Sequence, residues 1–554
     1  MRKSKSKKVL SWLLILTMMF VMVTGCSSKK NSYTEEMNLS VGDIYSSKES
    51  GQSGYGSVPD NTDNGAAGFD GMEKKAVADS MEEEFGGQEF NNEEYKFVRE
   101  NKLLSVKNNP ISTFSIDVDT ASYSNIRRMV LNGEQIPEDA VRIEEMLNYF
   151  RYDYPRPDNG EPFYIYREAS SCPWNEDAKL LLIGLQGKDI DMSQRPASNF
   201  VFLLDVSGSM NDPDKLPLMQ KAFLMLLENL NENDRISIVT YAGEERVVLE
   251  GARGNETMKI SKAIEELSAS GSTAGEAGIK RAYEIAREYY VEGGNNRVIL
   301  ATDGDLNVGV SSESELTKLI EEKRESGVFL SVLGFGTGNL KDNKLEALAD
   351  NGNGSYSYID SVLEAKKVLV EEMGGTLYTI AKDVKIQIEF NPAKIKGYRL
   401  IGYENRMLST EDFENDKKDA GEMGAGHRVT ALYEIIEITS KQEIPETNLT
   451  YTESNDMNSD EWLTVKVRYK EPDGAESKLL MLPTDESIYR QEMSENLSFA
   501  GGVAAFGMLL KNSEYKGNAS FEMVQTLLNQ HKNSFDEYKE EFRYLVNRYS
   551  MENK

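Results

Sequence analysis

Apolar runs alternate with amphipathic segments through the centre of the chain, beginning near Asn199. Each apolar run is short and continuous, which indicates a buried strand, and each amphipathic segment has the three-to-four spacing of a helix. The expected strands are 200–204, 235–241, 297–301, 328–334 and 355–359, and the expected helices are 215–230, 256–268, 275–290, 313–324, 340–349 and 362–373. Strands that are apolar on both faces need helices on both sides, so the pattern predicts a doubly wound, Rossmann-like α/β domain with a parallel sheet.

The segments on either side of this domain also contain expected strands and helices, but without the strict alternation of strand and helix. Before it, we expect strands at 112–119, 163–167 and 179–186, and helices at 120–131 and from Pro137 onward. After it, we expect strands in which apolar and polar residues alternate, at 384–390, 397–403, 430–439, 462–469 and 478–482. A helical tail is expected at 497–550. The strands before and after the α/β domain are expected to pair with each other, which would make that domain an insertion.

The first residues have the pattern of an export signal. Five basic side chains precede an apolar run from Val9 to Val23, which is shorter than the roughly 20 apolar residues of a membrane-spanning helix. The run leads into Val23-Thr24-Gly25-Cys26, which resembles the bacterial lipobox. The resemblance implies that Cys26 carries a diacylglyceryl thioether and becomes the mature N-terminus. We therefore expect a lipid anchor at the extracytoplasmic face of the cell membrane; an ordinary signal peptide with a chance cysteine is the alternative.

Composition adds a tether and excludes some partners. Residues 27 to about 96 are rich in Ser, Gly, Asn, Asp and Glu, too polar to form a core, and are expected to be a flexible tether. The net charge of -29 repels phosphate backbones, so we expect no nucleic-acid partner. Cys26 and Cys172 are the two cysteines, and acylation of Cys26 would leave no disulfide.

These boundaries predict five parts along the chain. They are a lipoprotein signal peptide (1–25), an acidic, Ser- and Gly-rich tether (26–96), an N-terminal α/β segment (97–196), the α/β domain (197–376), and a C-terminal β-rich and helical domain (377–554).

Oxygen-bearing side chains follow the expected strands of the α/β domain. Asp205, Ser207 and Ser209 come after its first strand, Asp303 follows the strand at 297–301, and Thr273 lies in a small-residue loop before a helix. In open α/β sheets, ligands bind beyond the carboxyl ends of the strands. Carboxylates and hydroxyls favour Mg²⁺, or Mn²⁺, over Zn²⁺, with Ca²⁺ ranked behind both. The sequence therefore predicts a site for a hard cation at this edge.

The pattern of these oxygens resembles the metal-ion-dependent adhesion site of von Willebrand factor A domains. An Asp-x-Ser-x-Ser turn, a later loop threonine and a later Thr-Asp-Gly occur in the family's order. The resemblance implies that Asp205, Ser207, Ser209, Thr273 and Asp303 are the ligands, with the serines binding directly and the aspartates partly through water. A metal-free domain in which these are ordinary turn residues is the alternative.

The resemblance extends beyond the central domain. Ser112–Ser124, Tyr398–Asn405 and Gly424-Ala-Gly-His427 look like segments of the YfbK-type bacterial A-domain lipoproteins, and the similarity runs from about residue 100 to 550. It implies the architecture described above and says little about function.

The expected function is binding without catalysis. A divalent ion that faces one or two carboxylates keeps an open position, which an Asp or Glu of a protein partner can fill. The sequence contains no Gly-x₄-Gly-Lys-Ser/Thr, His-Glu-x-x-His, Gly-x-Ser-x-Gly or Cys-x-x-Cys motif. We therefore expect a surface lipoprotein that acts in adhesion or envelope assembly. A Mg²⁺-dependent hydrolase or transferase, and a scaffold with a vestigial site, are the alternatives.

Three weaker signals have structural explanations as well as functional ones. Asp117 and Asp119 repeat part of the metal motif and suggest a second ion, although a strand end followed by a helix cap explains them too. His427 follows Gly-Ala-Gly and marks either a functional turn or a structural histidine. Cys172, which has no histidine near it in sequence, is expected to be a buried apolar residue rather than a nucleophile.

Overall fold

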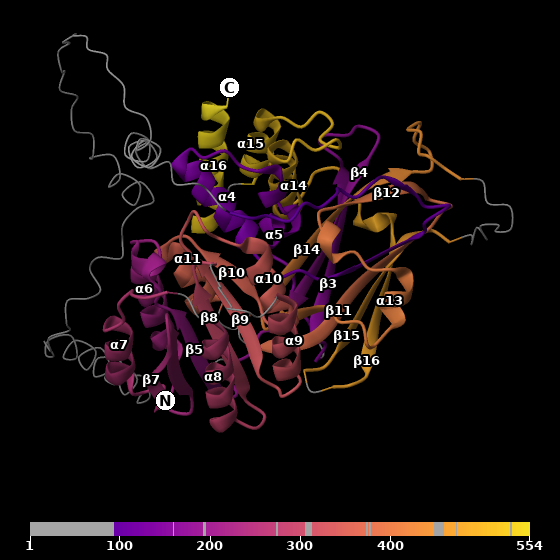
Figure 1. Cartoon of the computed structure of the whole chain (residues 1–554). Helices are drawn as coiled ribbons and strands as arrows, with labels where there is room; N and C mark the ends of the chain where they lie inside the picture. Colours follow the sequence, from indigo (N-terminus) through magenta and orange to yellow (C-terminus); the bar gives the residue numbers. More distant parts are fainter. Residues whose placement is uncertain are drawn as a thin grey trace, which may run out of the picture. The chain divides into compact units, whose positions relative to one another are not determined.

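The computed structural model describes residues 93–553, apart from 159, 192–194, 273–274, 305–312, 373–374, 376–377, 448–458, 473 and 532–534 (Figure 1). The expected signal peptide, its Cys26 and almost all of the tether lie outside these residues. Within them, no helix has both the length and the apolar character needed to cross a bilayer.

A six-stranded sheet forms the centre of the α/β domain, in the order β10-β9-β8-β5-β6-β7. The strands are β5 (Ser198–Asp205), β6 (Arg235–Tyr241), β7 (Glu245–Arg253), β8 (Asn295–Thr302), β9 (Phe329–Phe335) and β10 (Tyr356–Ile359). All neighbours are parallel except β6 and β7, which are antiparallel. The doubly wound fold is confirmed, and the expectation of an entirely parallel sheet is corrected at its β7 edge.

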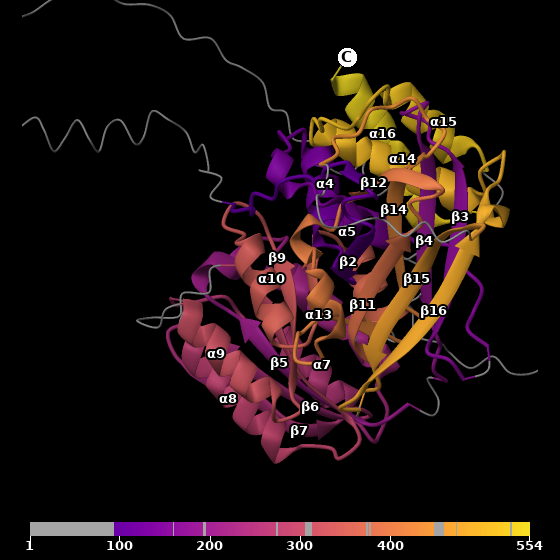
Figure 2. The same ribbon diagram turned by 90° about the vertical axis from the view of Figure 1, so that its right-hand side faces the viewer.

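Helices cover both faces of this sheet because β5 is apolar on both sides. Phe200 and Phe202 pack in the same core cluster as α6 and α7, whereas Val201 and Leu203 pack with α8 and α10. Figure 2 shows α8 and α9 on the outer side of the sheet. The helices are α6 (Leu216–Leu226), α7 (Thr257–Glu265), α8 (Gly275–Glu288), α9 (Glu313–Arg324), α10 (Asp342–Asn351) and α11 (Val362–Lys366), the last continued by a π-helical turn, η4 (Lys367–Glu371).

Two further sheets join the N-terminal and C-terminal parts of the chain. One has the order β1-β12-β14-β4-β3; in the other, β13-β11-β15-β16, strand β2 also pairs with β11. Leu182 of β4 lies opposite Leu432 of β14, which confirms that strands before and after the α/β domain pair. The strands are β1 (Leu104–Ser105), β2 (Ile111–Ser115), β3 (Phe163–Ser171), β4 (Lys179–Gly187), β11 (Thr379–Phe390), β12 (Ile395–Ile401), β13 (Gly421–Gly424), β14 (Arg428–Glu437), β15 (Glu461–Lys470) and β16 (Ser477–Asp485).

The helices outside the α/β domain pack together although they come from both ends of the described chain (Figure 1). They are α4 (Ala121–Asn132), α5 (Ile143–Asn148), α14 (Glu495–Leu510), α15 (Phe521–Asn529) and α16 (Glu537–Glu552), whereas the short α13 (Thr410–Glu414) lies apart from them against β2 and β11. Helix α14 is buried along almost its whole length, against α5 and α15. Short 3₁₀ turns complete the structure at η1 (Glu138–Ala140), η2 (Gly208–Asn211), η3 (Leu227–Asn229), η5 (Glu404–Arg406) and η6 (Glu486–Ile488).

The helix expected from Pro137 is interrupted. Pro137 caps the 3₁₀ turn η1, and α5 begins only at Ile143, because Val141 and Arg142 are extended. The backbone N–H of Arg142 donates to Oγ of Ser122, 2.9 Å away, instead of continuing a helix. A tertiary hydrogen bond therefore overrides the local helical pattern.

Candidate metal centre

Two neighbouring strands bring the expected ligands to one edge of the central sheet. Strands β5 and β8 run parallel, with Leu204 beside Ala301, so Asp205 and Thr302 end them side by side. The hydroxyl of Thr302 donates to Oδ2 of Asp205 at 3.1 Å, and both residues are fully buried. Asp303 follows Thr302 directly and is also buried. The two carboxylates of the motif therefore come from adjacent strand ends.

The turn after β5 aims its hydroxyls back at this edge. The backbone N–H of Ser207 donates to Oδ1 of Asp205 at 2.9 Å, and Oγ of Ser207 lies 3.0 Å from Oγ of Ser209. Ser207 is buried, whereas Ser209 is exposed at the rim. A carboxylate and two hydroxyls thus form a compact oxygen cluster that solvent can reach.

The small-residue loop before α8 is held against the same turn. The N–H of Gly208 donates to the carbonyl of Gly271 at 3.0 Å, and the N–H of Ser270 donates to the carbonyl of Val206 at 2.8 Å. Gly271 has a φ of 82°, a conformation that residues with a side chain rarely adopt. Thr273 itself lies outside the described residues, so the structure places its loop and not its hydroxyl.

Lys215 is a residue of this site that the sequence interpretation missed. Its ammonium group lies 3.1 Å from Oδ2 of Asp303 and 3.2 Å from Oδ1 of Asn339. Lys215 is buried, and it immediately precedes α6. Asn339 was missed as well, because it sits in a loop with no recognisable motif. A lysine at the helix start that follows an Asp-x-Ser-x-Ser turn is the one signal that could have drawn attention to this contact.

The two carboxylates have opposite pKa shifts. Burial raises the pKa of Asp205 to about 6, although hydrogen bonds from Ser207 oppose the shift. Burial acts in the same direction on Asp303, but hydrogen bonding to Asn339 and the charge of Lys215 outweigh it and leave that pKa below its usual value. Asp303 is therefore ionised in the presence of its lysine partner, and a cation added at this edge would favour ionised Asp205 as well.

The donor set fits a hard divalent ion. Two carboxylates and two hydroxyls converge at the strand ends, and these are the oxygen ligands that Mg²⁺ and Mn²⁺ prefer. Among the residues that the structure describes, no three His, Cys, Asp or Glu side chains form a metal-binding group. The hydroxyls of Ser207 and Ser209 are therefore essential to any site here, because Asp205 and Asp303 alone are too few.

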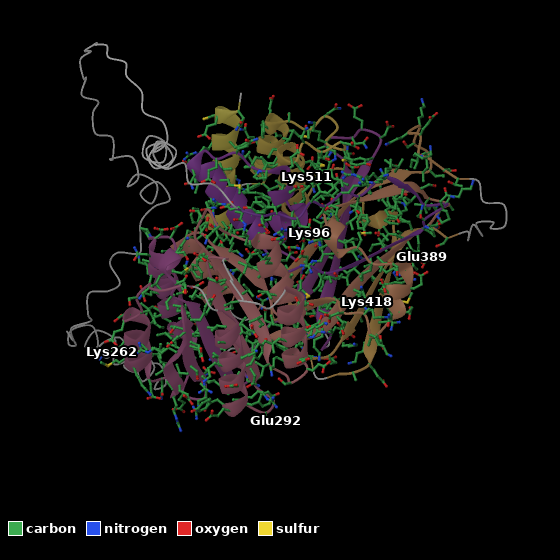
Figure 3. All side chains as sticks on the ribbon, in the orientation of Figure 1. Lys96, Lys262, Glu292, Glu389, Lys418 and Lys511 are labelled. Carbon is green, nitrogen blue, oxygen red and sulfur yellow. The ribbon has the colours of Figure 1, made fainter. Side chains whose placement is uncertain are left out.

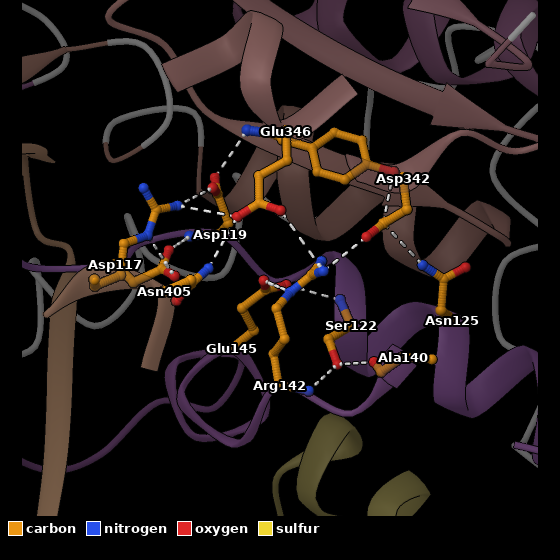
Figure 4. A network of polar contacts seen from close by, with 12 residues as sticks. Asp117, Asp119, Ser122, Asn125, Ala140, Arg142, Glu145, Asp342, Glu346 and Asn405 are labelled. Atoms are coloured by element: carbon orange, nitrogen blue, oxygen red, sulfur yellow. Dashed lines mark hydrogen bonds and ion pairs between the residues drawn. The ribbon is translucent and has the colours of Figure 1, made fainter. Parts of the chain in front are cut away.

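Asp117 and Asp119 have a guanidinium partner in the structure. Nε of Arg406 lies 3.0 Å from Oδ2 of Asp117, and Nη2 of Arg406 lies 3.1 Å from Oδ2 of Asp119 (Figure 4). The other oxygen of Asp119 accepts the N–H of Tyr356 at 2.8 Å. The aspartates that repeat part of the metal motif are thus explained by their ion pairs with Arg406. The helix-cap explanation is correct in that Thr120 stands at the N-cap position of α4, but its side chain makes no capping hydrogen bond.

These ion pairs continue into a buried network that joins the α/β domain to its surroundings. Arg142 contacts Glu145 and lies 2.8 Å from Asp342, the first residue of α10 (Figure 4). Arg127 of α4 lies 2.7 Å from Glu364 of α11 and 2.9 Å from Glu541 of α16. Buried pairs of this kind fix the positions of these helices relative to one another, because breaking one pair leaves an uncompensated buried charge.

Ion pairs at the surface have less weight. Lys262 pairs with Glu266, and Lys466 pairs with Glu389, with at least one partner of each pair at least half exposed. Figure 3 labels Lys262 and Glu389 among the side chains that cover the molecule. Such pairs contribute at most about 1 kcal/mol each, so removal of one exposed partner should cost less than removal of one partner of a buried pair.

Family models match three parts of the chain. Residues 199–371 match the von Willebrand factor type A domain, 375–551 match the C-terminal part of the uncharacterized protein YfbK, and 89–182 match a von Willebrand factor model. The chain is 42% identical over 464 residues to uncharacterized protein YfbK of Escherichia coli K12, covering 82% of this chain and 80% of that one.

More distant relatives share a smaller part. The uncharacterized protein sll0103 of Synechocystis is 33% identical over 188 residues, covering 33% of this chain and 43% of that protein. Human inter-alpha-trypsin inhibitor heavy chain H3 is 29% identical over 192 residues, covering 33% and 21% respectively. Among solved structures, a von Willebrand factor type A protein from Catenulispora acidiphila has a TM-score of 0.40 at 15% identity, covering 72% of this chain and 91% of that one.

Proposed function

The chain belongs to the YfbK family of proteins with a von Willebrand factor type A domain, and from this premise we propose that it binds a protein partner through a divalent cation. Domains of this type typically mediate protein–protein interaction or adhesion. The observation that carries the proposal is the convergence of Asp205, Ser207, Ser209 and Asp303 at the ends of β5 and β8. We propose Mg²⁺, or Mn²⁺, as the ion, with Thr273 as a fifth ligand.

Each residue has a distinct part in this proposal. The hydroxyls of Ser207 and Ser209 bind the ion, and Asp205 is oriented by the hydroxyl of Thr302. Asp303 contributes negative charge, part of which Lys215 already offsets. When bound, the ion supplies an electrophilic position that one carboxylate oxygen of a partner can fill. The exposure of Ser209 leaves the partner a way in.

The site is proposed to bind and not to catalyse. Activation of water needs a positioned base, and neither histidine is placed to serve as one. Nε2 of His531 contacts the carbonyl of Met493, and His427 lies beside Gly375, outside the oxygen cluster. We therefore propose a role in adhesion or in assembly of the cell envelope.

We further propose that Cys26 anchors the protein by a lipid to the extracytoplasmic face of the membrane. The support is the lipobox-like sequence, followed by a polar segment that separates the anchor from the folded part. Metabolic labelling with a radioactive fatty acid should label the wild type, whereas Cys26→Ala should lose both the label and the membrane association. Label retained in Cys26→Ala would contradict the anchor.

The binding proposal is tested by calorimetry and by crosslinking in intact cells. Titration of Mg²⁺ into the full chain should give one site, which Asp205→Ala and Asp303→Ala abolish. Glu292→Gln, an exposed carboxylate of the same domain, is the control and should leave the affinity unchanged. A photocrosslinker placed at Ser272, next to Thr273, should capture a protein partner only without chelator. Mg²⁺ binding that survives both aspartate substitutions would overturn the proposed site.

A further inference from the structure

A second candidate site lies away from the metal centre, in a pocket of about 310 Å³. Its walls come from the end of α5, from η4 at the end of the α/β domain, and from the turn between β13 and β14. The charged or titratable side chains that line it include Arg151, Arg156, His427, Arg428, Glu371 and Glu372. It shares no residue with the oxygen cluster around Asp205. The Gly-Ala-Gly-His sequence that has no part in the metal site lies in this wall.

Most charged groups of this pocket already have partners. Arg156 pairs with Asp189, and Glu372 accepts a hydrogen bond from Lys367 at 2.7 Å. Arg151 lies 3.5 Å from Glu371 and 3.7 Å from Glu372, which are long distances for ion pairs. Arg151 is therefore not held in a close ion pair, and it already lines the pocket.

Arg428 is the exception. It forms no ion pair with any residue of the described chain, and its Nε is buried without a hydrogen-bond partner. Burial lowers its pKa and the charge of Arg151 lowers it further, whereas the charges of Glu372 and Asp189 oppose the shift. An arginine cannot lose its proton in a protein, and a partly buried charge without a partner costs several kcal/mol. Arg428 thus has a buried N–H that is available to an anion in the pocket.

His427 adds a neutral donor beside Arg428. Its Nδ1 is buried without a hydrogen-bond partner. Burial lowers its pKa, so the ring is neutral near pH 7 and carries one N–H. A Cβ built at Gly375 would lie 3.1 Å from this nitrogen, so a glycine there leaves the ring room.

We propose that this pocket binds a small molecule through one oxyanion group, a carboxylate or a phosphate, held by Arg428 and Arg151 with a hydrogen bond from His427. Guanidinium groups bind such oxyanions with two parallel hydrogen bonds, which gives direction as well as strength. The pocket has the volume of the smaller ligand sites in proteins. Glu371 and Glu372 on its wall would repel a polyanion, so the ligand carries a single compact anionic group.

The test measures thermal unfolding of the full chain with inorganic phosphate or with acetate, at ionic strength held constant with NaCl. At least one of the two anions should raise the unfolding midpoint of the wild type. A rise with phosphate alone would identify a phosphate-bearing ligand, and a rise with acetate alone would identify a carboxylate. No rise with either anion would overturn the proposal.

Variants separate a binding role from a structural one. Arg428→Gln should abolish the rise and, without anion, should unfold at or above the wild-type midpoint, because an unpaired charge has been removed. Arg156→Gln, a rim residue already paired with Asp189, is the control and should keep the rise. An Arg428→Gln protein that is less stable than wild type and retains the rise would refute the assignment.

A second variant guards against a folding defect. If Arg428→Gln does not fold, Arg151→Gln takes its place, and calorimetry should show the dissociation constant for the active anion weakened at least tenfold. Unchanged affinity in Arg151→Gln would count against the pocket. Asp303→Asn should leave anion binding intact, so this proposal stands or falls independently of the metal site.

Discussion

The ammonium group of Lys215 lies 3.1 Å from Oδ2 of Asp303, so a cationic side chain of the protein already occupies an oxygen of the proposed metal centre. Asp303 is fully buried, and Lys215 places a positive charge beside its carboxylate. Lys215 is therefore expected to stabilise the metal-free protein and to compete with the incoming ion.

Replacement of this lysine separates the two effects. In Lys215→Met, loss of the competing charge should strengthen Mg²⁺ binding about tenfold, which is about 1.4 kcal/mol. The metal-free protein should lose roughly 1.5–3 kcal/mol of unfolding free energy, because a charged hydrogen bond is lost. Calorimetry and urea unfolding measure the two quantities. Lys262→Met, an exposed lysine of α7, is the control; weaker Mg²⁺ binding in Lys215→Met would show that the lysine assists the ion.

Thr302 is expected to act on the metal through Asp205. Its hydroxyl donates to Oδ2 of Asp205 at 3.1 Å, and removal of such supporting contacts costs about 10- to 100-fold in metal affinity. Thr302→Val should therefore weaken Mg²⁺ binding within that range and keep the fold, as circular dichroism can check. Ser237→Ala, which removes a buried hydroxyl from β6 of the same sheet, should leave the affinity unchanged. Equal losses in both variants would point to a general effect of the substitutions on the sheet.

The sequence predicts most of the central domain because its strands are buried on both faces. Strands β5, β6 and β8 are continuous apolar runs, and they lie close to the expected positions. Strand β7 escapes prediction because it is an exposed edge strand whose first residues, Glu245 and Arg246, are polar. A continuous apolar run is a local signal, and an edge strand paired on one side does not need one.

The site is predictable to the extent that its residues follow strands. Asp205 and Asp303 could be paired from sequence because parallel strands end at one edge. Lys215 could not be assigned, since it reaches Asp303 across 88 positions and no periodicity encodes that contact. The same holds for Arg406, which reaches Asp117 across 289 positions. Ion pairs between distant segments depend on tertiary packing, which local patterns do not specify.

Arg406 is expected to be essential for stability. It is paired with Asp117 and Asp119, which are 2% and 4% exposed, and it lies 3.0 Å from Asp350 as well. Arg406→Met would leave buried carboxylates without their cation, a change that typically costs 3–5 kcal/mol. Urea unfolding should show this loss, whereas Arg548→Met, at a more exposed pair on α16, should change stability by less than about 1 kcal/mol. If the two variants lose similar stability, the network has no special role.

Glu144 provides a pH-dependent test of the same region. It is 1% exposed, its Oε2 has no hydrogen-bond partner, and burial together with the charge of Glu404 raises its pKa to about 7. Between pH 4.5 and about 7, the folded protein therefore keeps the proton of the Glu144 carboxyl group, whereas the unfolded chain, in which the pKa is 4.5, has released it. The contribution of Glu144 to stability is present below about pH 4.5 and is lost as the pH rises to about 7.

Glu144→Gln removes the ionisable carboxyl group and should therefore remove the loss of stability at high pH. At pH 8 the variant should exceed the wild type by up to roughly 3 kcal/mol in unfolding free energy, since each pKa unit corresponds to about 1.4 kcal/mol. At pH 4.5 the two proteins should differ little, because the wild-type carboxyl is then protonated when folded. Urea unfolding at the two pH values measures the difference. Glu138→Gln, at an exposed carboxylate of the neighbouring 3₁₀ turn, is the control. If the difference in unfolding free energy between Glu144→Gln and the wild type does not grow with pH, the ionised carboxylate of Glu144 must be stabilised in the folded protein by other groups.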